Sequence, residues 1–212
     1  MSRAAELAKF IGDGTLGLGG AEDKKLVFNG NAQDFHIGLD DSADSLTIGL
    51  GSTLGTTSHM IMDANGHITK PLQSAFLITK SSTQSDLALN TENTIEYDTE
   101  RFDQNGDFAS NTFTAPVTGR YQLNTMNFMG NIDSAATYYS LRIRTSNRDY
   151  FGTAYAPSST DSDPAYWVFS ANVLADMDAN DTAIVTLYQP NGTAQTDADG
   201  SHVCSFSGFL AC

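Results

Sequence analysis

The first third of the chain alternates short apolar bursts with turns rich in Gly and Asp. Within residues 13–70 these bursts fall at residues 26–28, 35–37, 46–48 and 60–62, and each predicts one short strand. Bursts of this size cannot bury a core within one copy of the chain. The pattern therefore predicts a Gly-rich, trimeric β stem over this range, in which other copies supply the missing surface.

A hairpin is predicted inside this stem. Two apolar-containing segments, residues 60–64 and 67–70, flank the dipeptide Asn65-Gly66. Asn-Gly supplies the two positive φ angles of a type I′ turn, so the sequence predicts that turn type here.

A short helix is predicted over residues 1–12. Ser2 is a suitable N-cap, and Ala4, Leu7 and Phe10 recur on one side. A helix of this length is not stable alone, so it needs a partner. The partner is either the same helix of sister copies or a docking surface on a larger assembly, and a disordered tail is the remaining alternative.

The sequence pattern changes at Pro71, after which the predicted strands are longer and aromatic residues are more frequent. We place the domain boundary there and predict a head over residues 71–212. Many strands separated by turn residues are typical of a sandwich or jelly roll. The predicted strands are residues 75–80, 94–98, 112–114, 119–129, 136–145, 149–154, 165–174, 182–188 and 202–210.

One of these strands changes phase part of the way along. Tyr121 and Leu123 share one face, whereas Met126 and Phe128 follow with a slip of one residue. A β-bulge absorbs such a slip, so the sequence predicts a bulge within residues 119–129.

Composition and charge exclude several classes of partner. The chain has 212 residues and a formal net charge of -14, and it lacks a basic stripe with interleaved aromatics, which argues against nucleic acid binding. No apolar run reaches the length of a membrane span, and the N-terminus lacks the apolar stretch of a secretory signal. We therefore expect that the chain does not insert into a membrane and that it is synthesised in a host cytoplasm. Cys204 and Cys212 lie eight residues apart in a segment that is predicted to be one strand, which separates them by about 26 Å and excludes a disulfide between them. Two free thiols are expected, and pairing of Cys212 between subunits is the alternative.

The head resembles a known family. The segments that carry the likeness are residues 94–97, 102–108, 112–121 and 205–210. They look like the globular head of complement and tumour-necrosis-factor-like proteins, and the resemblance spans residues 72–212. The residues that match the family signature position by position are Phe113, Pro116, Gly119, Tyr121, Ser207, Gly208, Phe209 and Leu210.

This resemblance implies a ten-stranded jelly roll that packs as a homotrimer and binds ligands on its outer loops. The stem segments at residues 46–51 and 62–68 resemble neck and shaft modules of phage tail fibres. A trimeric head and a trimeric stem need the same number of copies, so the two resemblances are consistent. The absence of a signal peptide and of a collagen-like Gly-X-Y stalk favours a viral fibre over the secreted animal setting.

Two sets of residues are candidates for ligand binding. Aromatic side chains stack on the apolar faces of sugars, although core or subunit interface is the commoner role of such residues. Acidic loops that meet near a three-fold axis offer oxygen ligands to Ca²⁺, the alternative being solvated turns. No organic cofactor is expected. The aromatic candidates are Tyr138, Tyr150, Tyr155, Tyr166 and Trp167, and the metal candidates are Asp161, Asp163, Asp176, Asp178 and Asp181.

Motifs of catalysis are not recognisable in the sequence. We find no nucleophile elbow, phosphate loop or zinc-protease helix, so the chain is expected not to be an enzyme. The sequence thus predicts a trimeric virion fibre or adhesin. Its N-terminus attaches to other virion proteins, and its head binds a host surface glycan or protein. A purely structural virion appendage and a polysaccharide-degrading spike are the two alternatives.

Overall fold

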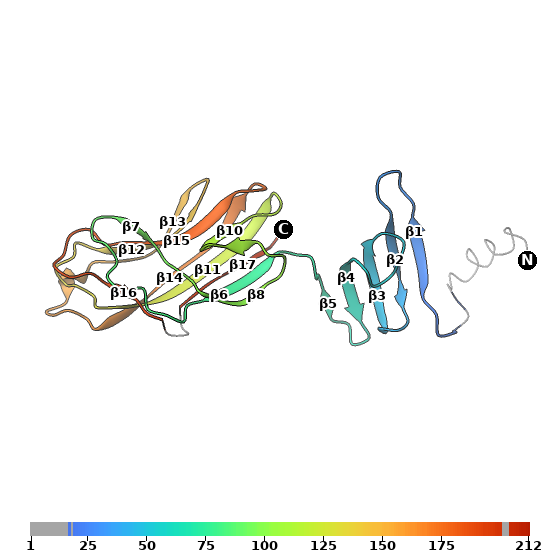
Figure 1. Ribbon diagram of the computed structural model, residues 1–212, viewed down its shortest axis with the longest axis horizontal. Helices are drawn as coiled ribbons and strands as arrows, with labels where there is room; N and C mark the ends of the chain where they lie inside the picture. Colours follow the sequence, from blue (N-terminus) through green and yellow to red (C-terminus); the bar gives the residue numbers. More distant parts are fainter. Residues whose placement is uncertain (1–16, 18, 201–203) are drawn as a thin grey trace, which may run out of the picture. The chain divides into compact units, whose positions relative to one another are not determined.

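The computed structural model describes residue 17, residues 19–200 and residues 204–212. The helix predicted over residues 1–12 lies outside this part of the chain. The chain forms two compact units, one that ends at Gln73 and one that spans Ser74–Cys212. We call the second unit the head. Both units are built from strands, as Figure 1 shows, which confirms the predicted all-β class.

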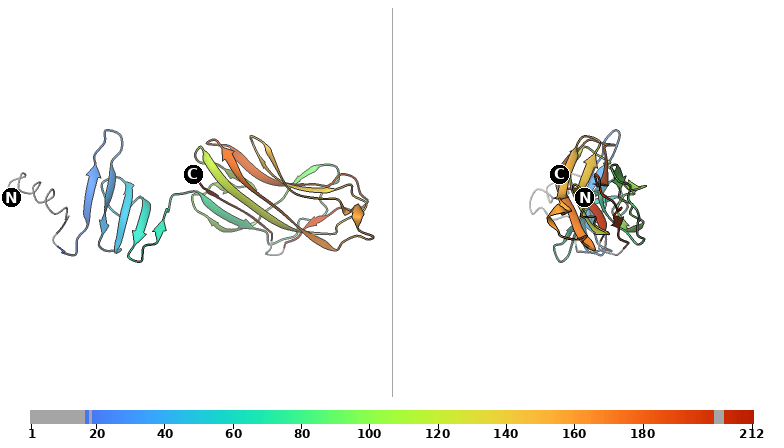
Figure 2. Two further views of the ribbon diagram at one scale, coloured as in Figure 1. Left: turned by 180° about the vertical axis from the view of Figure 1, so that it is seen from behind. Right: turned by 90° about the vertical axis from the view of Figure 1, so that its left-hand side faces the viewer.

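The first unit is a single antiparallel sheet in which consecutive strands are neighbours. We call it the stem sheet, and Figure 2 shows its strands in sequence order from blue to cyan. Each of the four predicted bursts lies within one of its first four strands. The strands are β1 (Lys24–Phe28), β2 (Phe35–Asp40), β3 (Ser45–Leu50), β4 (Ser58–Asp63) and β5 (Ile68–Thr69).

The predicted hairpin is present between β4 and β5, but its turn type is different. Only Gly66 has a positive φ, of 86°, and Asn65 does not. The Gly66 amide donates to the carbonyl of Asp63 at 3.0 Å, and the Asp63 amide donates to the carbonyl of His67 at 3.1 Å. These bonds describe a three-residue loop with a type I turn followed by Gly66. The type I′ prediction was wrong because the Asp63 carboxylate accepts the Asn65 and His67 amides and so favours the longer loop.

The stem sheet buries its polar face and leaves its apolar face open. In β2 and β3 the buried positions are polar or glycine, for example His36 and Thr47, whereas Leu39 and Leu46 are exposed. The segment after β3 covers the polar face, because the Gly51 carbonyl lies 2.9 Å from His36 Nδ1 and Leu54 is buried. One copy of the chain therefore leaves a hydrophobic sheet face without a second layer.

The head is a sandwich of two antiparallel sheets, each with a five-stranded path. The strand order is that of a jelly roll, which confirms the predicted fold of the head. The first path runs β14 (Tyr166–Met177), β11 (Gly119–Gly130), β17 (Ser205–Leu210), β6 (Ala75–Thr79) and β8 (Thr99–Asp103), and the short β16 (Asp197–Ala198) also pairs with β11. The second runs β13 (Asp149–Tyr155), β12 (Tyr139–Thr145), β15 (Thr182–Tyr188), β10 (Thr112–Thr114) and β9 (Phe108–Ala109), and β7 (Glu92–Thr94) also pairs with β15.

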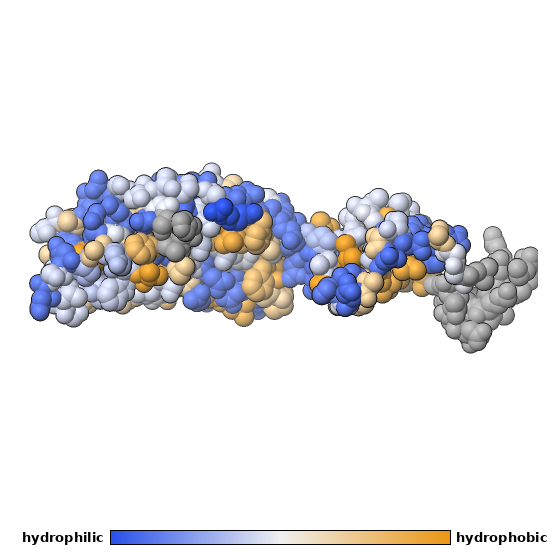
Figure 3. Space-filling view, turned by 90° about the horizontal axis from the view of Figure 1, so that it is seen from below, coloured by the Kyte–Doolittle hydropathy of each residue, from blue (hydrophilic) through white to orange (hydrophobic). Residues whose placement is uncertain are grey.

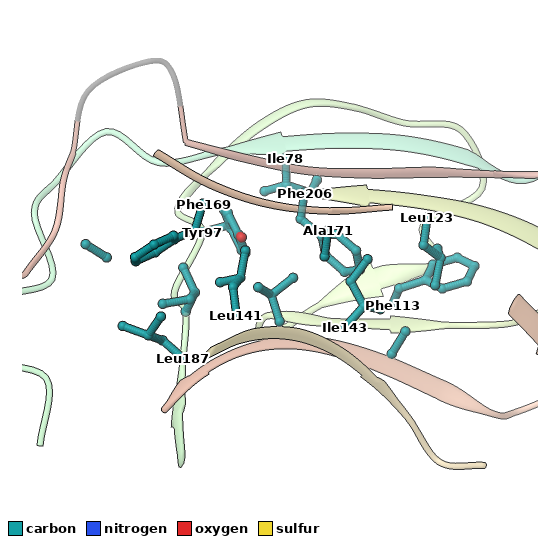
Figure 4. Close-up of a cluster of buried hydrophobic side chains, with 14 of the residues drawn as sticks. Ile78, Tyr97, Phe113, Leu123, Leu141, Ile143, Phe169, Ala171, Leu187 and Phe206 are labelled. Carbon is teal, nitrogen blue, oxygen red and sulfur yellow. The ribbon is translucent and has the colours of Figure 1, made fainter. Parts of the chain in front are cut away.

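The head core lies between the two sheets and is rich in aromatic rings (Figure 4). Phe76 stacks on Phe113 with ring centroids 4.7 Å apart and meets Phe206 edge-on at 5.2 Å. Gly208 lies opposite these rings, and a Cβ there would come within 2.6 Å of Leu123 and 2.8 Å of Phe76. Glycine at this position lets β17 approach the aromatic cluster closely.

Two expectations about head strands were wrong. The segment predicted as strand 94–98 is not a strand beyond its first residue, since β7 ends at Thr94. The bulge predicted within β11 is absent, because the strand keeps one register with β14 along its whole length. Thr125 and Asn127 take the inward positions, and Met126 faces outward with 41% of its surface exposed.

The polar residues Thr125 and Asn127 can occupy inward positions of β11 because they form hydrogen bonds with each other and with Tyr97. The Tyr97 hydroxyl lies 2.9 Å from Thr125 Oγ1 and donates to Asn127 Oδ1 at 3.1 Å. Asn127 Nδ2 donates to Thr125 Oγ1, which donates in turn to the carbonyl of Ser205. Burial raises the pKa of Tyr97 far above its usual value, so the hydroxyl keeps its proton. A satisfied network of this kind tolerates polar residues in a core.

Removal of one hydroxyl tests this network. In Thr125→Val the Asn127 amide loses its acceptor, so we expect the free energy of unfolding to fall by about 1–3 kcal/mol. Urea denaturation should show a lower midpoint and an unchanged slope. Thr125→Ser retains the hydroxyl and should lose less than half as much. Equal stability of the valine variant and the wild type would contradict the role of the network.

The two cysteines and the lengths of the helices relate to the sequence predictions on disulfides and membrane spans. Cys204 is buried and Cys212 is exposed, both are free thiols, and β17 lies between them. Among the described residues no helix is long and apolar enough to span a membrane.

The outer face of the β14–β11–β17 sheet carries exposed apolar side chains. Leu174, Phe209 and Met126 are between 41% and 56% exposed. Leu174 and Phe209 flank Gln122 across three strands, so they lie on one face. The space-filling view shows apolar surface on both units (Figure 3).

Candidate functional site

The head has two distinct ends, which β11 connects. At one end, the base, the chain joins the head at Ser74, whose carbonyl accepts the Leu210 amide, and the C-terminal residue Cys212 accepts the Arg120 amide. β11 has 12 residues and runs from Gly119 at the base to Gly130. At about 3.3 Å per residue this strand spans roughly 36 Å. We call the far end, at Gly130, the tip.

A cavity of about 810 Å³ opens at the tip. Ligand pockets in proteins have volumes of this order, roughly 300–1,000 Å³. Four loops that are distant in sequence form it, and its walls combine carboxylates, side-chain amides and a few apolar groups. The residues that line it are Asp86, Leu89, Asn131, Ile132, Asp133, Asp163, Pro164, Ala165, Thr193, Ala194 and Gln195.

Asp133 organises one wall of this tip pocket. The residue is only 2% exposed, and its carboxylate accepts hydrogen bonds from the backbone amides of Thr193, of Ala194 at 2.8 Å and of Ala135 at 2.8 Å. Gly192 precedes these donors with φ of 105°, and a Cβ there would lie 2.6 Å from the Asp133 carboxylate. Glycine therefore lets the 193–195 loop wrap around Asp133.

The hydrogen bonds to Asp133 also determine its charge. Burial alone raises the pKa of a carboxyl group, but the three backbone amides outweigh that effect and hold the pKa of Asp133 below its usual value. The group is therefore ionised at neutral pH.

A second carboxylate, Asp163, also lines the pocket. Asp163 accepts hydrogen bonds from the side chain and the backbone amide of Ser134, and these bonds lower its pKa. Asp86 contributes a third acid, and its own amide donates to Asp197 at 2.8 Å. The pocket is therefore negatively charged and rich in hydrogen-bond acceptors.

Aromatic side chains form a ledge next to the pocket. Ala165 lines the pocket and directly precedes Tyr166 and Trp167 at the start of β14. Trp167 stacks on Tyr155 of β13 with centroids 4.6 Å apart and an interplanar angle of 12°, and 42% of its surface stays exposed. The stacked pair joins the edges of the two sheets beside the pocket.

The structure brings together only part of the predicted aromatic set. Tyr155 and Trp167 form the ledge, whereas Tyr166 lies on the other face of β14, where it stacks on Phe128 at 4.9 Å. Tyr150 lies toward the base, where its hydroxyl donates to Asp176 at 3.1 Å.

Tyr138 also lies apart from the Tyr155–Trp167 ledge. It precedes β12 and contacts Tyr188 of β15, the neighbouring strand of the same sheet, with ring centroids 6.0 Å apart. Tyr138, Tyr150 and Tyr166 therefore do not share one groove with the ledge.

The five predicted metal residues divide between the two ends of β14. Asp161 and Asp163 precede this strand at the tip, and the other three lie at or just beyond its end at the base. The Asp176 carboxylate pairs with Arg148 at 2.8 Å. Asp181 accepts hydrogen bonds from Ser146 and Asn147 and from the amide of Asp178. Within the described residues no group of three His, Cys, Asp or Glu side chains is placed to hold a metal ion.

Sequence reasoning missed most of the tip pocket. It identified Asp163 but not Asp133, Asn131 or Gln195, because their loops lie up to about 110 residues apart from Asp86 along the chain. The signal that could have pointed to them is the turn at Asn191-Gly192, where both residues have positive φ.

Comparison with known proteins gives structural matches only. No protein-family model matches the chain, and no curated protein matches its sequence. The globular domain of a zebrafish complement 1qA protein is 15% identical with a TM-score of 0.47, and the match covers 66% of this chain and 98% of that one. Murine APRIL is 10% identical with a TM-score of 0.45, and the match covers 65% and 98%. The jelly-roll fold of the head is defined by its own strand order, and the site by its own contacts.

Proposed function

We propose that this chain is a non-enzymatic adhesin, a homotrimeric virion fibre whose head binds a neutral host glycan at the tip pocket. The observation that carries the proposal is the position of this pocket. It opens at the end of the head opposite the base, where the rest of the chain is attached. A binding site at the free end of a head is suited to contact with another surface.

The chemistry of the pocket favours a hydroxyl-rich ligand without negative charge. Asp163 is exposed and can accept hydrogen bonds, and the side-chain amides of Asn131 and Gln195 add further polar partners. Asp133 contributes by holding the 193–195 loop in place and by its charge. Trp167 offers an exposed ring beside them, and aromatic rings stack on the apolar faces of sugars. The same carboxylates repel acidic sugars, as does the net charge of -14.

Trimer formation is supported by the exposed apolar face of the head. Leu174 and Phe209 lie on one sheet face with exposures of 56% and 47%, and Met126 lies on the same side of β11. Contiguous exposed apolar surface on a soluble protein marks an interaction site. Packing of this face against sister copies leaves the tip pocket free. In this proposal the N-terminus attaches the fibre to other virion proteins.

Loss of the exposed ring tests the proposed glycan site. Trp167→Ala should weaken binding of a neutral oligosaccharide by about fivefold, since stacking on an aromatic ring contributes about 1 kcal/mol. Titration calorimetry against oligosaccharides selected from an array of neutral and sialylated glycans measures the change. Phe151→Ala is the matched control, because Phe151 lies on β13 like Tyr155, is 66% exposed and lies nearer the base.

The same array distinguishes the alternatives. Binding only to sialylated glycans, or equal binding by the wild type and the Trp167 variant, would contradict the proposed site. An intact trimer that binds no glycan or host cell would favour the purely structural appendage. Release of shorter oligosaccharides would indicate an enzyme. Glycan binding that is lost in the presence of a chelator would indicate that the predicted Ca²⁺ takes part in binding.

A further inference from the structure

The stem sheet shows an inversion of the usual burial pattern. Residues paired across its strands align as rows, and one row is Leu39, Leu46 and Met62 while the next is Leu26, Ile37 and Ile48. Among the residues paired in register, every position of this face is apolar except Lys24 at the edge strand. His59 of β4 lies outside that register and contacts Phe35, with ring centroids 6.0 Å apart. We call it the apolar stem face. Its apolar residues are Leu26, Phe28, Phe35, Ile37, Leu39, Leu46, Ile48, Leu50, Met60, Met62 and Ile68.

The apolar stem face is open in one copy of the chain. Phe28 is 62% exposed, Ile68 54%, and Leu26, Phe35, Leu39 and Leu46 between 40% and 44%. The opposite face is already covered by the segment that contains Leu54. A single sheet with one open hydrophobic face needs a second layer.

We propose that the apolar stem face is a self-association interface, on which two further copies of this chain pack their own stem sheets around a three-fold axis. This deepens the proposed function, because it rests on the homotrimer and assigns to the stem sheet its own share of trimer formation. The stem sheet holds the copies together independently of the head.

The size of the face fits this occupant. Its six exposed and five half-buried apolar side chains leave on the order of 700 Å² open per copy, close to the roughly 800 Å² that each partner contributes to a stable interface. Apart from Lys24 at the edge strand, the charged residues of the strands, for example Lys25 and Asp40, lie on the opposite face. The interior of the apolar stem face therefore offers no charge to a polar or acidic partner, whereas an identical face is complementary to it.

The edges of the sheet favour packing through the face. β1 carries Lys24 and Lys25, and lysine on an edge strand opposes pairing with another strand. β5 has only two residues, so the other edge is short. Growth by strand addition is thus disfavoured, and a closed arrangement of three faces buries the apolar residues instead.

Light scattering of the full chain tests the proposal with adjacent substitutions on β1. Leu26 and Val27 have nearly equal exposures, 41% and 38%, but lie on opposite faces. Leu26→Asp and the central Leu46→Asp should lose the trimer, with at least a hundredfold weaker association, whereas Val27→Asp should keep it. The expected wild-type mass is about three times 22.7 kDa.

Cross-linking provides a measurement that does not depend on a destabilising charge. In a Cys212→Ala background, Leu46→Cys should give covalent dimers and trimers with a short bis-maleimide, and Val27→Cys should give none. A trimer that survives Leu46→Asp but dissociates in Leu174→Asp would overturn the role of the stem sheet and leave the trimeric head intact. A monomeric wild type would overturn both proposals.

Discussion

Replacement of Asp133 by alanine is expected to abolish glycan binding at the tip pocket and to lower the free energy of unfolding by about 3 kcal/mol. The variant leaves the backbone amides of Thr193, Ala194 and Ala135 without their acceptor. Hydrogen bonds to a charged group contribute about 1.5–3 kcal/mol each, and water replaces part of that at the exposed loop. Calorimetric titration and urea denaturation measure the two effects.

The pH dependence of the free energy of unfolding provides a second test of the Asp133 carboxylate. The folded-state pKa of Asp133 lies below its unfolded value, so its stabilising effect is complete above the unfolded pKa of about 3.9. It is lost as the pH falls through the lower, folded-state pKa. The wild type should therefore lose more stability than Asp133→Ala on acidification below about pH 4.

Two control variants distinguish an effect of Asp133 on ligand binding from an effect on the stability of the fold. Asp161→Ala removes an exposed acid that does not line the pocket and should leave both binding and stability within about 0.5 kcal/mol of the wild type. Asp133→Asn keeps one acceptor oxygen, so its loss of stability should be intermediate. Unchanged glycan binding by Asp133→Ala would show that the ligand does not occupy the tip pocket.

Truncation of Phe76 is expected to have the largest effect on stability. Its ring is 1% exposed and lies among three others, with Phe113 at 4.7 Å, Phe206 at 5.2 Å and Phe108 at 5.4 Å. Phe→Ala in a core of this kind costs about 3–5 kcal/mol, because it removes buried area and leaves a cavity. The midpoint of thermal unfolding should fall by roughly 10 °C or more.

The control for Phe76 is again an aromatic residue outside the core. Phe151→Ala removes the same side chain from a position that is 66% exposed, where it contacts Arg142 at 4.3 Å. Its cost should stay near 1 kcal/mol. Differential scanning calorimetry of the head transition measures both variants. Equal shifts for the two substitutions would contradict the assignment of the core.

Local patterns in the sequence determined the class of the fold and most of its strands. The four apolar bursts of the stem each coincide with part of a strand, and strands such as β10 and β15 have the predicted bounds. These predictions succeeded because side-chain alternation is a property of adjacent residues. The signature residues Phe113 and Gly208 are both buried.

Local patterns failed where distant segments decide the outcome. The phase change expected at Met126 does not occur, because Tyr97 supplies hydrogen bonds that make Thr125 and Asn127 acceptable inside the sandwich. The tip pocket likewise depends on Asp133 meeting a loop 60 residues later in the sequence. Hydrogen bonding between residues so far apart is fixed by the packing of the two sheets, which no local periodicity records.

The stem sheet shows most clearly which properties follow from the sequence and which follow from the tertiary structure. The sequence by itself determined that the bursts form short strands and that one copy lacks a core. Only the tertiary structure decided which face is left open, because the pairing of rows such as Leu39, Leu46 and Met62 depends on the register between strands. A shift of one residue in that register would have put the polar face outside.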